Sequence, residues 1–373
     1  MIVSVPRETA PGEARVALVP ELVGKLAKAG ATVVVEAGAG TRAGFPDGAY
    51  RDAGASVEID PRAAWGGDAV LKVQEPRDDE VERLKDGATL LGLLRPAERP
   101  QLLERYAARH VTAFALERVP RTSRAQKMDA LSAMSTIAGY KAVLLAAARL
   151  PRFFPLLMTA AGTIPPARVL ILGAGVAGLS AIATARRLGA VVEAYDIRPA
   201  VREEVQSLGA TFVGPEDGPA PVASAAGAGG SGAYAGELTD EVKRRVQDLL
   251  ATHVAAADVV ITTALVPGRR APLLVPEAVV RRMKPGAVIV DLAAEAGGNC
   301  ALTRPGEEAD VDGVTILGPL NLPATVPGDA SRMYARTITA LFLHLVKDGA
   351  LVPDFADDIV AQSCIARPAG LPA

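Results

Sequence analysis

The chain has 373 residues, which is too long for one ordinary hydrophobic core and predicts two α/β domains. Its residues are 50% apolar and 22% charged, a composition that excludes wholesale disorder. The net charge of −2 leaves no basic surplus for a polyphosphate backbone, so we do not expect nucleic acid as a partner.

The cysteines and the lengths of the apolar stretches indicate in which compartment the protein is expected. Cys300 and Cys364 are isolated thiols, which fit a reducing compartment and favour a cytoplasmic protein. The first twenty residues lack a basic segment followed by an apolar one, so no signal peptide is expected. Mainly apolar stretches such as 142–148 and 259–267 fall short of the ~20 residues that span a bilayer, and we expect no membrane crossing. No metal site is predicted.

In chain order, the first third alternates short apolar runs with amphipathic helices. The helical segments, such as PELVGKLAKAG, place apolar residues three and four apart. The apolar runs lie at residues 32–36, 69–73, 90–94 and 111–116. This alternation predicts a parallel sheet covered by helices. A long helical pattern follows from about residue 128 to 150 and ends at a Pro-rich break.

A second alternating series begins at Ala167. Its apolar runs are RVLILG, VVEAYD, DVVITT, AVIVDL and VTILG, and they predict a second doubly wound sheet. Residues 330–347 then predict a helix that packs back on the first domain. We therefore expect an α/β protein with two doubly wound parallel-sheet (Rossmann-like) domains, the first discontinuous. The predicted boundaries are 1–130 plus 325–373 for the first domain and 131–324 for the second domain.

A glycine-rich turn joins the first strand of the second domain to a helix. It has the spacing G-x-G-x-x-G and consists of Gly173, Ala174, Gly175, Val176, Ala177 and Gly178. In such a turn the first glycine allows the bend, the second lets the backbone approach a pyrophosphate, and the third lets helix and strand pack closely. The alternative is a turn that serves packing alone. The following strand favours dinucleotide binding, because it ends in Asp196, near the ~20-residue offset at which an acid binds ribose hydroxyls.

The same acid bears on the choice of dinucleotide. Asp196 favours NAD over NADP, because a carboxylate repels a 2′-phosphate. Arg198 follows two residues later and could offset that repulsion. We predict NAD(H) as the cofactor of this chain.

Several further segments resemble one family. They are TSRAQKMDALSAM at residues 122–134, AGYKAV at 138–143, DIRPAVREEVQSLGA at 196–210, TALVPGRRAP and VDLAAEAGGNC. Together they are similar to the NAD(H)-binding component of proton-translocating NAD(P) transhydrogenase, a family related to alanine dehydrogenase. The resemblance extends from Arg7 to about Val360.

The resemblance implies a loop that holds the nicotinamide ring. The family's spacing R-x4-Q-x2-D-x2-S gives Arg121, Gln126, Asp129 and Ser132 as the candidate catalytic residues, with Arg121 and Gln126 also contacting the cofactor. An Arg, an amide and a carboxylate close together can fix the carboxamide and ribose, which sets the face from which hydride leaves. From the residues alone, Asp129 or Ser132 could equally cap the following helix.

Further cofactor contacts are implied around the phosphate loop. They are Ile197 and Arg198 beside Asp196, and Ala264 and Leu265 in TALVPGRRAP. Residues 212–236 are rich in Gly, Ala and Pro and resemble the family's mobile loop, which folds over the nucleotide and offers a tyrosine, here Tyr234. The alternative for this stretch is a flexible linker.

The main alternative function is that of an alanine dehydrogenase-like NAD-dependent amino acid oxidoreductase. Arg15 and Lys72 match its substrate-binding positions, and Glu295 falls where that family places a catalytic Asp. Amine oxidation needs a proton acceptor, yet the expected histidine is replaced by Arg95, which stays protonated. The three histidines, His110, His253 and His344, are interpreted as structural or surface groups. Hydride transfer between two nicotinamides needs no such base, so its absence favours transhydrogenation.

The resemblance also implies partners. Hydride would pass directly from NADH on this chain to NADP⁺ on a partner subunit, and the implied partners are membrane-embedded subunits and an NADP(H)-binding domain. Family members are homodimers, so a homodimer is expected. The sequence stops soon after DDIVAQSC, which favours a split-subunit arrangement, cytoplasmic and peripheral at the inner face of the membrane. A catalytically silent NAD-sensing protein is a third interpretation, which would not need the nicotinamide loop.

Overall fold

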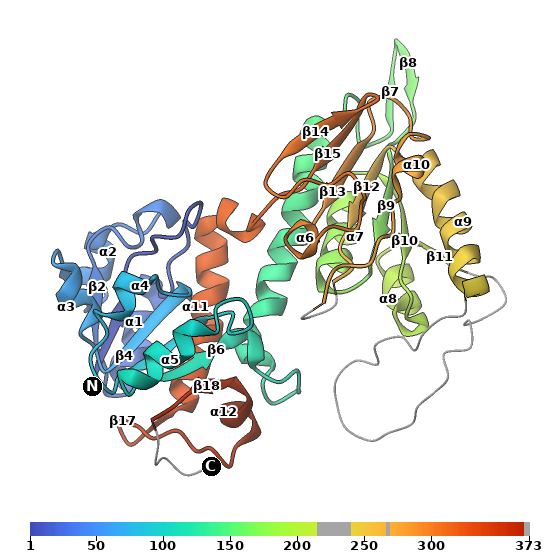
Figure 1. Cartoon of the computed structure of the whole chain (residues 1–373). Coiled ribbons are helices and arrows are strands. Elements are labelled where there is room, and N and C mark those ends of the chain that lie inside the picture. Colours follow the sequence, from blue (N-terminus) through green and yellow to red (C-terminus); the bar gives the residue numbers. More distant parts are fainter. Residues whose placement is uncertain (215–239, 266–268, 369–373) are drawn as a thin grey trace. The chain divides into compact units, whose positions relative to one another are not determined.

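The computed structural model describes residues 1–214, 240–265 and 269–368 and divides into two compact units (Figure 1). Unit 1 comprises Met1–Met134 and Pro323–Ala373, and unit 2 comprises Ser135–Leu322. Each unit contains a seven-stranded, mostly parallel sheet with flanking helices. This confirms the predicted α/β fold with two Rossmann-like sheets, the first built from two stretches of chain. The domain boundaries at residues 130 and 325 stay a prediction, which limited proteolysis would test.

The sheet of unit 1 has the order β18-β6-β5-β4-β1-β2-β3. Its first six strands follow the doubly wound order 3-2-1-4-5-6 and pair in parallel, whereas β18 pairs antiparallel with β6 at the edge. The strands are β1 (Ile2–Val5), β2 (Thr32–Glu36), β3 (Ser56–Glu58), β4 (Ala69–Gln74), β5 (Thr89–Leu93), β6 (Thr112–Ala115) and β18 (Cys364–Ala366). The antiparallel edge strand was not predicted from the sequence.

The helices of unit 1 come from both stretches of chain. They are α1 (Pro20–Lys28), α2 (Asp47–Asp52), α3 (Pro61–Trp65), α4 (Asp78–Val81), α5 (Gln101–Ala108), α11 (Pro327–His344) and α12 (Asp358–Ser363). Shorter elements are η1 (Thr41–Ala43), η2 (Leu116–Arg118), η3 (Gln126–Met128), β16 (Val346–Lys347) and β17 (Ala350–Leu351). The Tyr334 hydroxyl on α11 donates to the Lys72 carbonyl at 2.7 Å, and the Val16 amide donates to the Ser331 hydroxyl at 3.0 Å. These bonds tie α11 to the first stretch, as the sequence predicts.

The sheet of unit 2 has the order β11-β10-β9-β12-β13-β15-β14, again 3-2-1-4-5-6 with an antiparallel edge strand, β14. Its strands are β9 (Arg168–Leu172), β10 (Val191–Tyr195), β11 (Thr211–Val213), β12 (Val259–Thr262), β13 (Val288–Asp291), β14 (Glu308–Val311) and β15 (Val314–Leu317). The helices are α6 (Ala130–Arg149), whose first turn belongs to unit 1, α7 (Val176–Arg187), α8 (Arg202–Ser207), α9 (Asp240–Ala256) and α10 (Glu277–Val280). Short 3-10 turns are η4 (Pro199–Val201) and η5 (Ala294–Ala296), and a third, η6 (Leu322–Thr325), begins at the last residue of unit 2 and continues into unit 1.

Alternation along the strands sorts side chains onto the two faces of this sheet. On β9, Val169 and Ile171 share a buried cluster with residues of α6, α7 and α8. Leu170 and Leu172 share a second cluster with residues of α9 and α10. The period of two thus gives a sheet that is apolar on both faces and covered on both by helices, as Figure 1 shows.

Helix α6 is apolar enough to be compared with a membrane span. Within the described residues it alone has the length and composition of one. Its contacts inside unit 2 are those of a packed helix, because a Cβ at Gly139 would lie 2.0 Å from the Ala177 carbonyl oxygen on α7. The Ser180 hydroxyl also donates to the Thr136 carbonyl at 2.7 Å. Gly139 therefore permits a close approach of α6 to α7.

Candidate functional site

The phosphate loop lies at the carboxyl end of β9, where the strand order of unit 2 reverses between β9 and β12. Such a reversal is where open α/β sheets bind ligands. Gly173 has a φ of +105°, which favours glycine, and a Cβ there would meet the Thr263 hydroxyl at 2.6 Å. A Cβ at Gly178 would lie 1.9 Å from the Gly173 carbonyl oxygen. These two glycines are required by packing.

Gly175 differs from its two neighbours in the motif. It precedes α7 with a φ of −78°, and a Cβ at this position would meet nothing closer than the Arg198 guanidinium at 4.0 Å. Packing therefore does not require a glycine here. The open space lies at the N-terminus of α7, where amide groups and the helix dipole favour a bound anion.

Asp196 contacts the phosphate loop directly. Its carboxylate accepts from the Ala174 amide at 2.8 Å and from the Arg198 amide and Nε, each at 2.9 Å. Burial opposes ionisation, but the hydrogen bonds from Arg198 and Ala174 outweigh it and hold the pKa of the Asp196 carboxyl below its ordinary value. The site therefore presents an ionised carboxylate at the end of β10, partly neutralised by Arg198. Ile197, between them, is exposed.

The segment after β12, residues 263–265, lies beside the phosphate loop and forms one wall of the candidate site. The Thr263 hydroxyl donates to the Gly173 carbonyl at 2.9 Å, and a Cβ at Gly173 would come within 3.2 Å of the Ala264 amide nitrogen. Leu265 is 53% exposed although it is a large apolar side chain. Unit 2 thus brings together the phosphate loop, Asp196 and the Ala264 segment. Tyr234, the expected lid residue, lies outside the described residues.

Sequence reasoning missed the polar network that supports this wall. The buried Asn299 side chain hydrogen bonds to the backbone of Ala264, and the buried Asp291 carboxylate accepts from the Asn299 backbone amide. The only sequence signals are a polar residue ending the apolar run AVIVD and the amide in GGNC. Neither signal indicates which groups the Asp291 and Asn299 side chains will contact.

The predicted nicotinamide loop belongs to unit 1. Arg121 and Gln126 are exposed, and Gln126 begins the turn η3. Asp129 accepts from the Ser132 amide at 2.8 Å and from its hydroxyl at 2.6 Å. This is the geometry of a cap at the start of α6, so these two side chains have a structural task whatever else they do.

A neighbouring arginine anchors that loop. Arg124 contacts Asp357 at 2.6 Å and also pairs with Asp358, at the start of α12. Asp357 accepts from the Ile359 amide at 2.8 Å and lies 3.3 Å from His344. Although burial acts in the opposite direction, the bonds from Arg124 and the Ile359 amide lower the pKa of Asp357 to about 2. The loop is therefore fixed to the C-terminal stretch of unit 1.

Arg15 and Lys72, the candidate amino acid ligands, are both buried and paired with carboxylates of the protein. Arg15 Nε donates to Glu13 at 2.7 Å, and Lys72 Nζ lies 3.2 Å from Glu8 and 3.6 Å from Glu80. Their charges are thus compensated within unit 1. Both side chains therefore neutralise buried carboxylates of the protein itself.

The positions that bear on the alanine dehydrogenase-like alternative, and two of the histidines, have local structural features of their own. Arg95 has a φ of +42°, and its amide donates to Glu117 at 2.6 Å. Glu295 is exposed and accepts from the Asn321 amide at 3.1 Å. His253 lies 2.8 Å from Glu193, and His110 has a φ of +53° just after α5. Within the described residues, no cluster of His, Cys, Asp or Glu is arranged to hold a metal ion.

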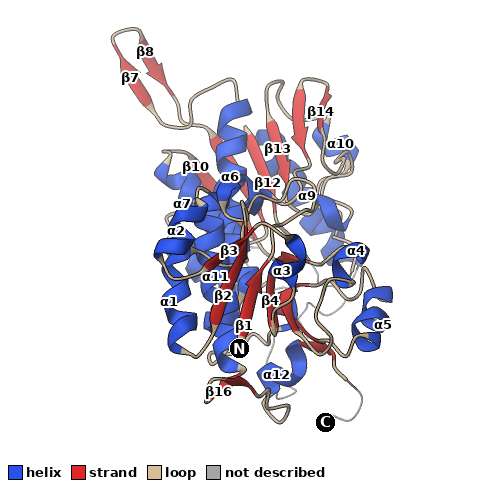
Figure 2. Ribbon diagram, turned by 90° about the vertical axis from the view of Figure 1, so that its left-hand side faces the viewer, coloured by secondary structure: helices blue, strands red, loops and turns tan. Residues whose placement is uncertain are grey.

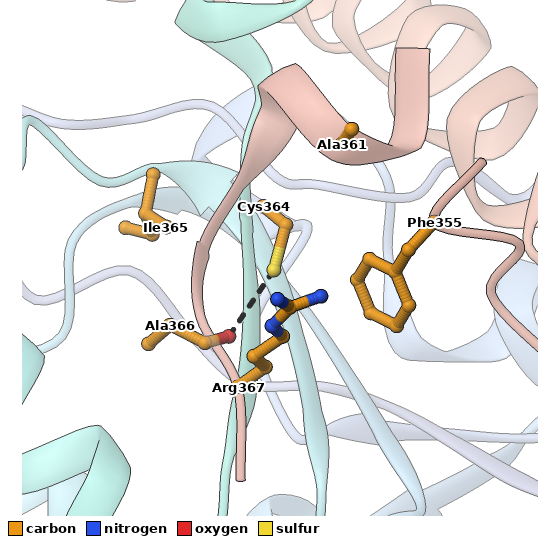
Figure 3. A pocket seen from close by; sticks show the side chains of 6 residues that line it. All are labelled: Phe355, Ala361, Cys364, Ile365, Ala366 and Arg367. Carbon is orange, nitrogen blue, oxygen red and sulfur yellow. Dashed lines mark hydrogen bonds between the residues drawn. The ribbon is translucent and has the colours of Figure 1, made fainter. Parts of the chain in front are cut away.

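A separate pocket in unit 1 lies beside β18 (Figure 3). The Arg367 guanidinium lies 4.9 Å from the centre of the Phe355 ring, and the Cys364 thiol donates to the Ala366 carbonyl at 3.4 Å. The lining residues are Phe355, Ala361, Cys364, Ile365, Ala366 and Arg367. None of them is a predicted site residue, so this pocket is not part of the candidate site.

Two family models match the chain. Residues 4–138 match the alanine dehydrogenase/PNT N-terminal domain, and residues 142–370 match the alanine dehydrogenase/PNT C-terminal domain. Together they cover most of the chain. The family resemblance deduced from the sequence motifs is thereby confirmed at the level of both domains.

Individual relatives agree with the family models. The chain is 44% identical to the first part of the divided alpha subunit of NAD(P) transhydrogenase from Rhodospirillum rubrum, covering 98% of this chain and 96% of that protein. The crystal structure of transhydrogenase from Sinorhizobium meliloti matches with a TM-score of 0.89 and 41% identity, over 98% of this chain and 99% of that one. Alanine dehydrogenase of Bacillus subtilis is 31% identical over 94% of this chain and 87% of its own length, a more distant similarity.

Proposed function

Because the chain belongs to the alanine dehydrogenase/PNT family, we propose that it is the NAD(H)-binding component of a proton-translocating NAD(P) transhydrogenase. The observation that carries the proposal is the contact between Asp196 and the Ala174 amide, which joins a ribose-binding acid to a phosphate loop at the switch point of unit 2. The names of the more similar relatives support transhydrogenation over amino acid oxidation.

The proposed chemistry is direct hydride transfer to NADP⁺ on a partner subunit. NADH, when bound, supplies the hydride, and the protein supplies position. The exposed Arg121 and Gln126 are available to hold the nicotinamide end. No base is needed, which fits Arg95 in place of a histidine and the internally paired Arg15 and Lys72.

The proposed partners follow from the same relatives. Those proteins are named as pieces of an alpha subunit, a name that implies further subunits, and we infer an NADP(H)-binding domain and membrane-embedded subunits as partners of this chain. The chain would then be held at the inner face of the membrane through these partners. Proton translocation would occur in the membrane subunits.

A decisive test uses the purified chain, its separately expressed NADP(H)-binding partner domain, NADH, NADP⁺ and an oxidised NAD analogue. We expect analogue reduction that requires both the partner domain and NADP⁺. A parallel reaction contains the chain, L-alanine and NAD⁺ and is expected to form no NADH. NADH formation from alanine by the chain alone would overturn the proposal in favour of the alanine dehydrogenase-like alternative.

Gln126→Ala should separate hydride transfer from nucleotide binding. Because Gln126 is exposed on η3, the variant should fold normally, retain NADH binding and lose at least tenfold in transhydrogenation through misplacement of the nicotinamide, about 1.4 kcal/mol of transition-state stabilisation. Lys127→Ala, in the same turn and equally exposed, is the matched control and should keep wild-type rates. Unchanged turnover in Gln126→Ala would contradict the assigned role.

The β-hairpin of β7 (Leu157–Thr159) and β8 (Gly162–Ile164) supports the proposed homodimer. It projects from the rest of unit 2 (Figure 2), and residues 153–166 contain no charged side chain. Met158 is 76% exposed, and Phe153, Leu156 and Ile164 are also exposed. An isolated two-stranded hairpin with exposed apolar residues is marginal in water, so we infer that a second copy covers it.

Met158→Asp should therefore weaken the dimer. A charge placed in an apolar contact must be desolvated, and we expect at least a tenfold rise in the dimer dissociation constant, which analytical ultracentrifugation would measure. Ile59→Asp, an exposed apolar position in unit 1, is the control. If Met158→Asp dimerises as well as the unmodified chain, the hairpin is not the interface.

A further inference from the structure

Asn299 uses its whole side-chain amide on the backbone of the candidate nucleotide site. Its Nδ2 donates to the Ala264 carbonyl at 2.9 Å and to the Pro272 carbonyl at 2.7 Å, and its Oδ1 accepts from the Ala264 amide at 3.0 Å. The residue is completely buried. One side chain thus fixes both polar groups of Ala264 and a second point of the same segment.

Asp291 holds Asn299 in place. This buried carboxylate, at the end of β13, accepts hydrogen bonds from the backbone amide of Asn299 at 2.8 Å, the Thr303 hydroxyl at 2.7 Å and the Thr262 hydroxyl at 2.8 Å. A buried polar network whose members are all hydrogen bonded specifies one geometry. The network therefore spans the ends of β12 and β13, beside the switch point of the sheet.

These hydrogen bonds determine which groups of Ala264 and Leu265 remain available to a ligand. Because Asn299 hydrogen bonds to both the amide and the carbonyl of Ala264, the backbone of this residue does not depend on a polar partner from a ligand. Leu265, the next residue, remains 53% exposed. The wall next to Gly173 therefore presents apolar side chains, and its backbone is held in place by the buried Asn299 side chain.

We propose that Asn299 is a positioning residue that holds Ala264 and Leu265 as the apolar wall against which the dinucleotide packs. The chemistry that suits this wall is the uncharged face of the nucleotide, contacted by van der Waals packing rather than hydrogen bonds. This inference rests on the proposed NAD(H) binding and adds to it a role for Asn299, which is not among the predicted site residues. Asn299 acts through Ala264 and Leu265 and has no role in the hydride step.

Asn299→Asp tests the proposal with almost no change in volume. The substitution replaces the Nδ2 donor with an acceptor, which faces the Ala264 and Pro272 carbonyls and removes two hydrogen bonds. Thr303→Val is the matched control, because it removes one bond to the same Asp291 carboxylate without touching the Ala264 segment. Both variants should lower the unfolding midpoint, but only Asn299→Asp should misplace the wall.

NADH affinity of the full-length chain, followed by nicotinamide fluorescence, is the first measurement. We expect about tenfold weaker binding in Asn299→Asp and a change below about twofold in Thr303→Val. In the reconstituted hydride-transfer assay, Asn299→Asp should raise the KM for NADH and leave kcat at saturation unchanged. Equal affinity losses in the two variants, or a lower kcat at unchanged KM, would overturn the positioning role.

Leu265→Ser provides a second test that does not depend on folding of the buried variant. Because Leu265 is exposed, its loss should leave the unfolding midpoint unchanged and weaken NADH binding about fivefold through lost apolar contact. Wild-type affinity in Leu265→Ser would contradict the apolar wall. Failure of the unmodified chain to bind NADH would instead reject the proposed function itself.

Discussion

Gly175→Val is expected to abolish NADH binding while leaving the chain folded. The φ of −78° at Gly175 is open to valine, and the space around its Cβ position holds nothing nearer than Arg198 at 4.0 Å. That space is where a pyrophosphate must approach the start of α7. The branched side chain would fill it and exclude the anion. We expect at least a hundredfold loss of NADH affinity by fluorescence titration, about 2.7 kcal/mol.

The matched variant in the same motif is Gly178→Ala. Its added methyl group would lie 1.9 Å from the Gly173 carbonyl oxygen, so the loop or α7 must move. Overpacking of this kind costs about 1–3 kcal/mol or more, and the unfolding midpoint should fall. Gly175→Val should instead unfold at the wild-type midpoint. Wild-type NADH affinity in Gly175→Val would show that the dinucleotide does not bind over this glycine.

The sequence predicts those parts of the site that depend on local patterns. Short continuous apolar runs identify β9 and β12, and the glycine spacing identifies the turn, because each follows from the conformation of a few consecutive residues. Asp196 is found by its offset, because a βαβ unit has a nearly fixed length. The contact between Asp196 and the Ala174 amide then follows from parallel pairing of β9 and β10.

The parts that the sequence does not predict depend on long-range pairing. Asn299 reaches Ala264 over 35 residues, and no periodicity indicates which backbone groups a buried amide will satisfy. The antiparallel strand β18 has only 3 residues, which carry too little pattern to be distinguished from a loop. The ion pairs of Lys72 with Glu8 and Glu80 likewise join three separate segments.

The second large effect is expected for Lys72→Met, because Lys72 forms ion pairs with residues from distant segments of the chain. Lys72 is 1% exposed, lies between Glu8 and Glu80, and its ammonium is 5.1 Å from the centre of the Trp65 ring. Methionine nearly preserves the volume but leaves the buried Glu8 carboxylate without its cation, whereas Glu80 keeps Arg77 at 3.7 Å. Breaking a buried pair in this way costs about 3–5 kcal/mol, so we expect a marked loss of the free energy of unfolding in a urea titration.

The pH dependence of Lys72→Met distinguishes lost charge from lost packing. Burial raises the pKa of Glu8 above 4.5, and Lys72 opposes that shift, so removing Lys72 should raise this pKa further. The folded state then keeps a proton that the unfolded state releases, and stability falls as the pH rises above about 4.5. The deficit of Lys72→Met should therefore be smaller at pH 5 than at pH 8. Adding Glu8→Gln should restore part of the stability at pH 8, because it removes one unpaired charge; an equal deficit at both pH values would assign the loss to packing around Trp65 instead.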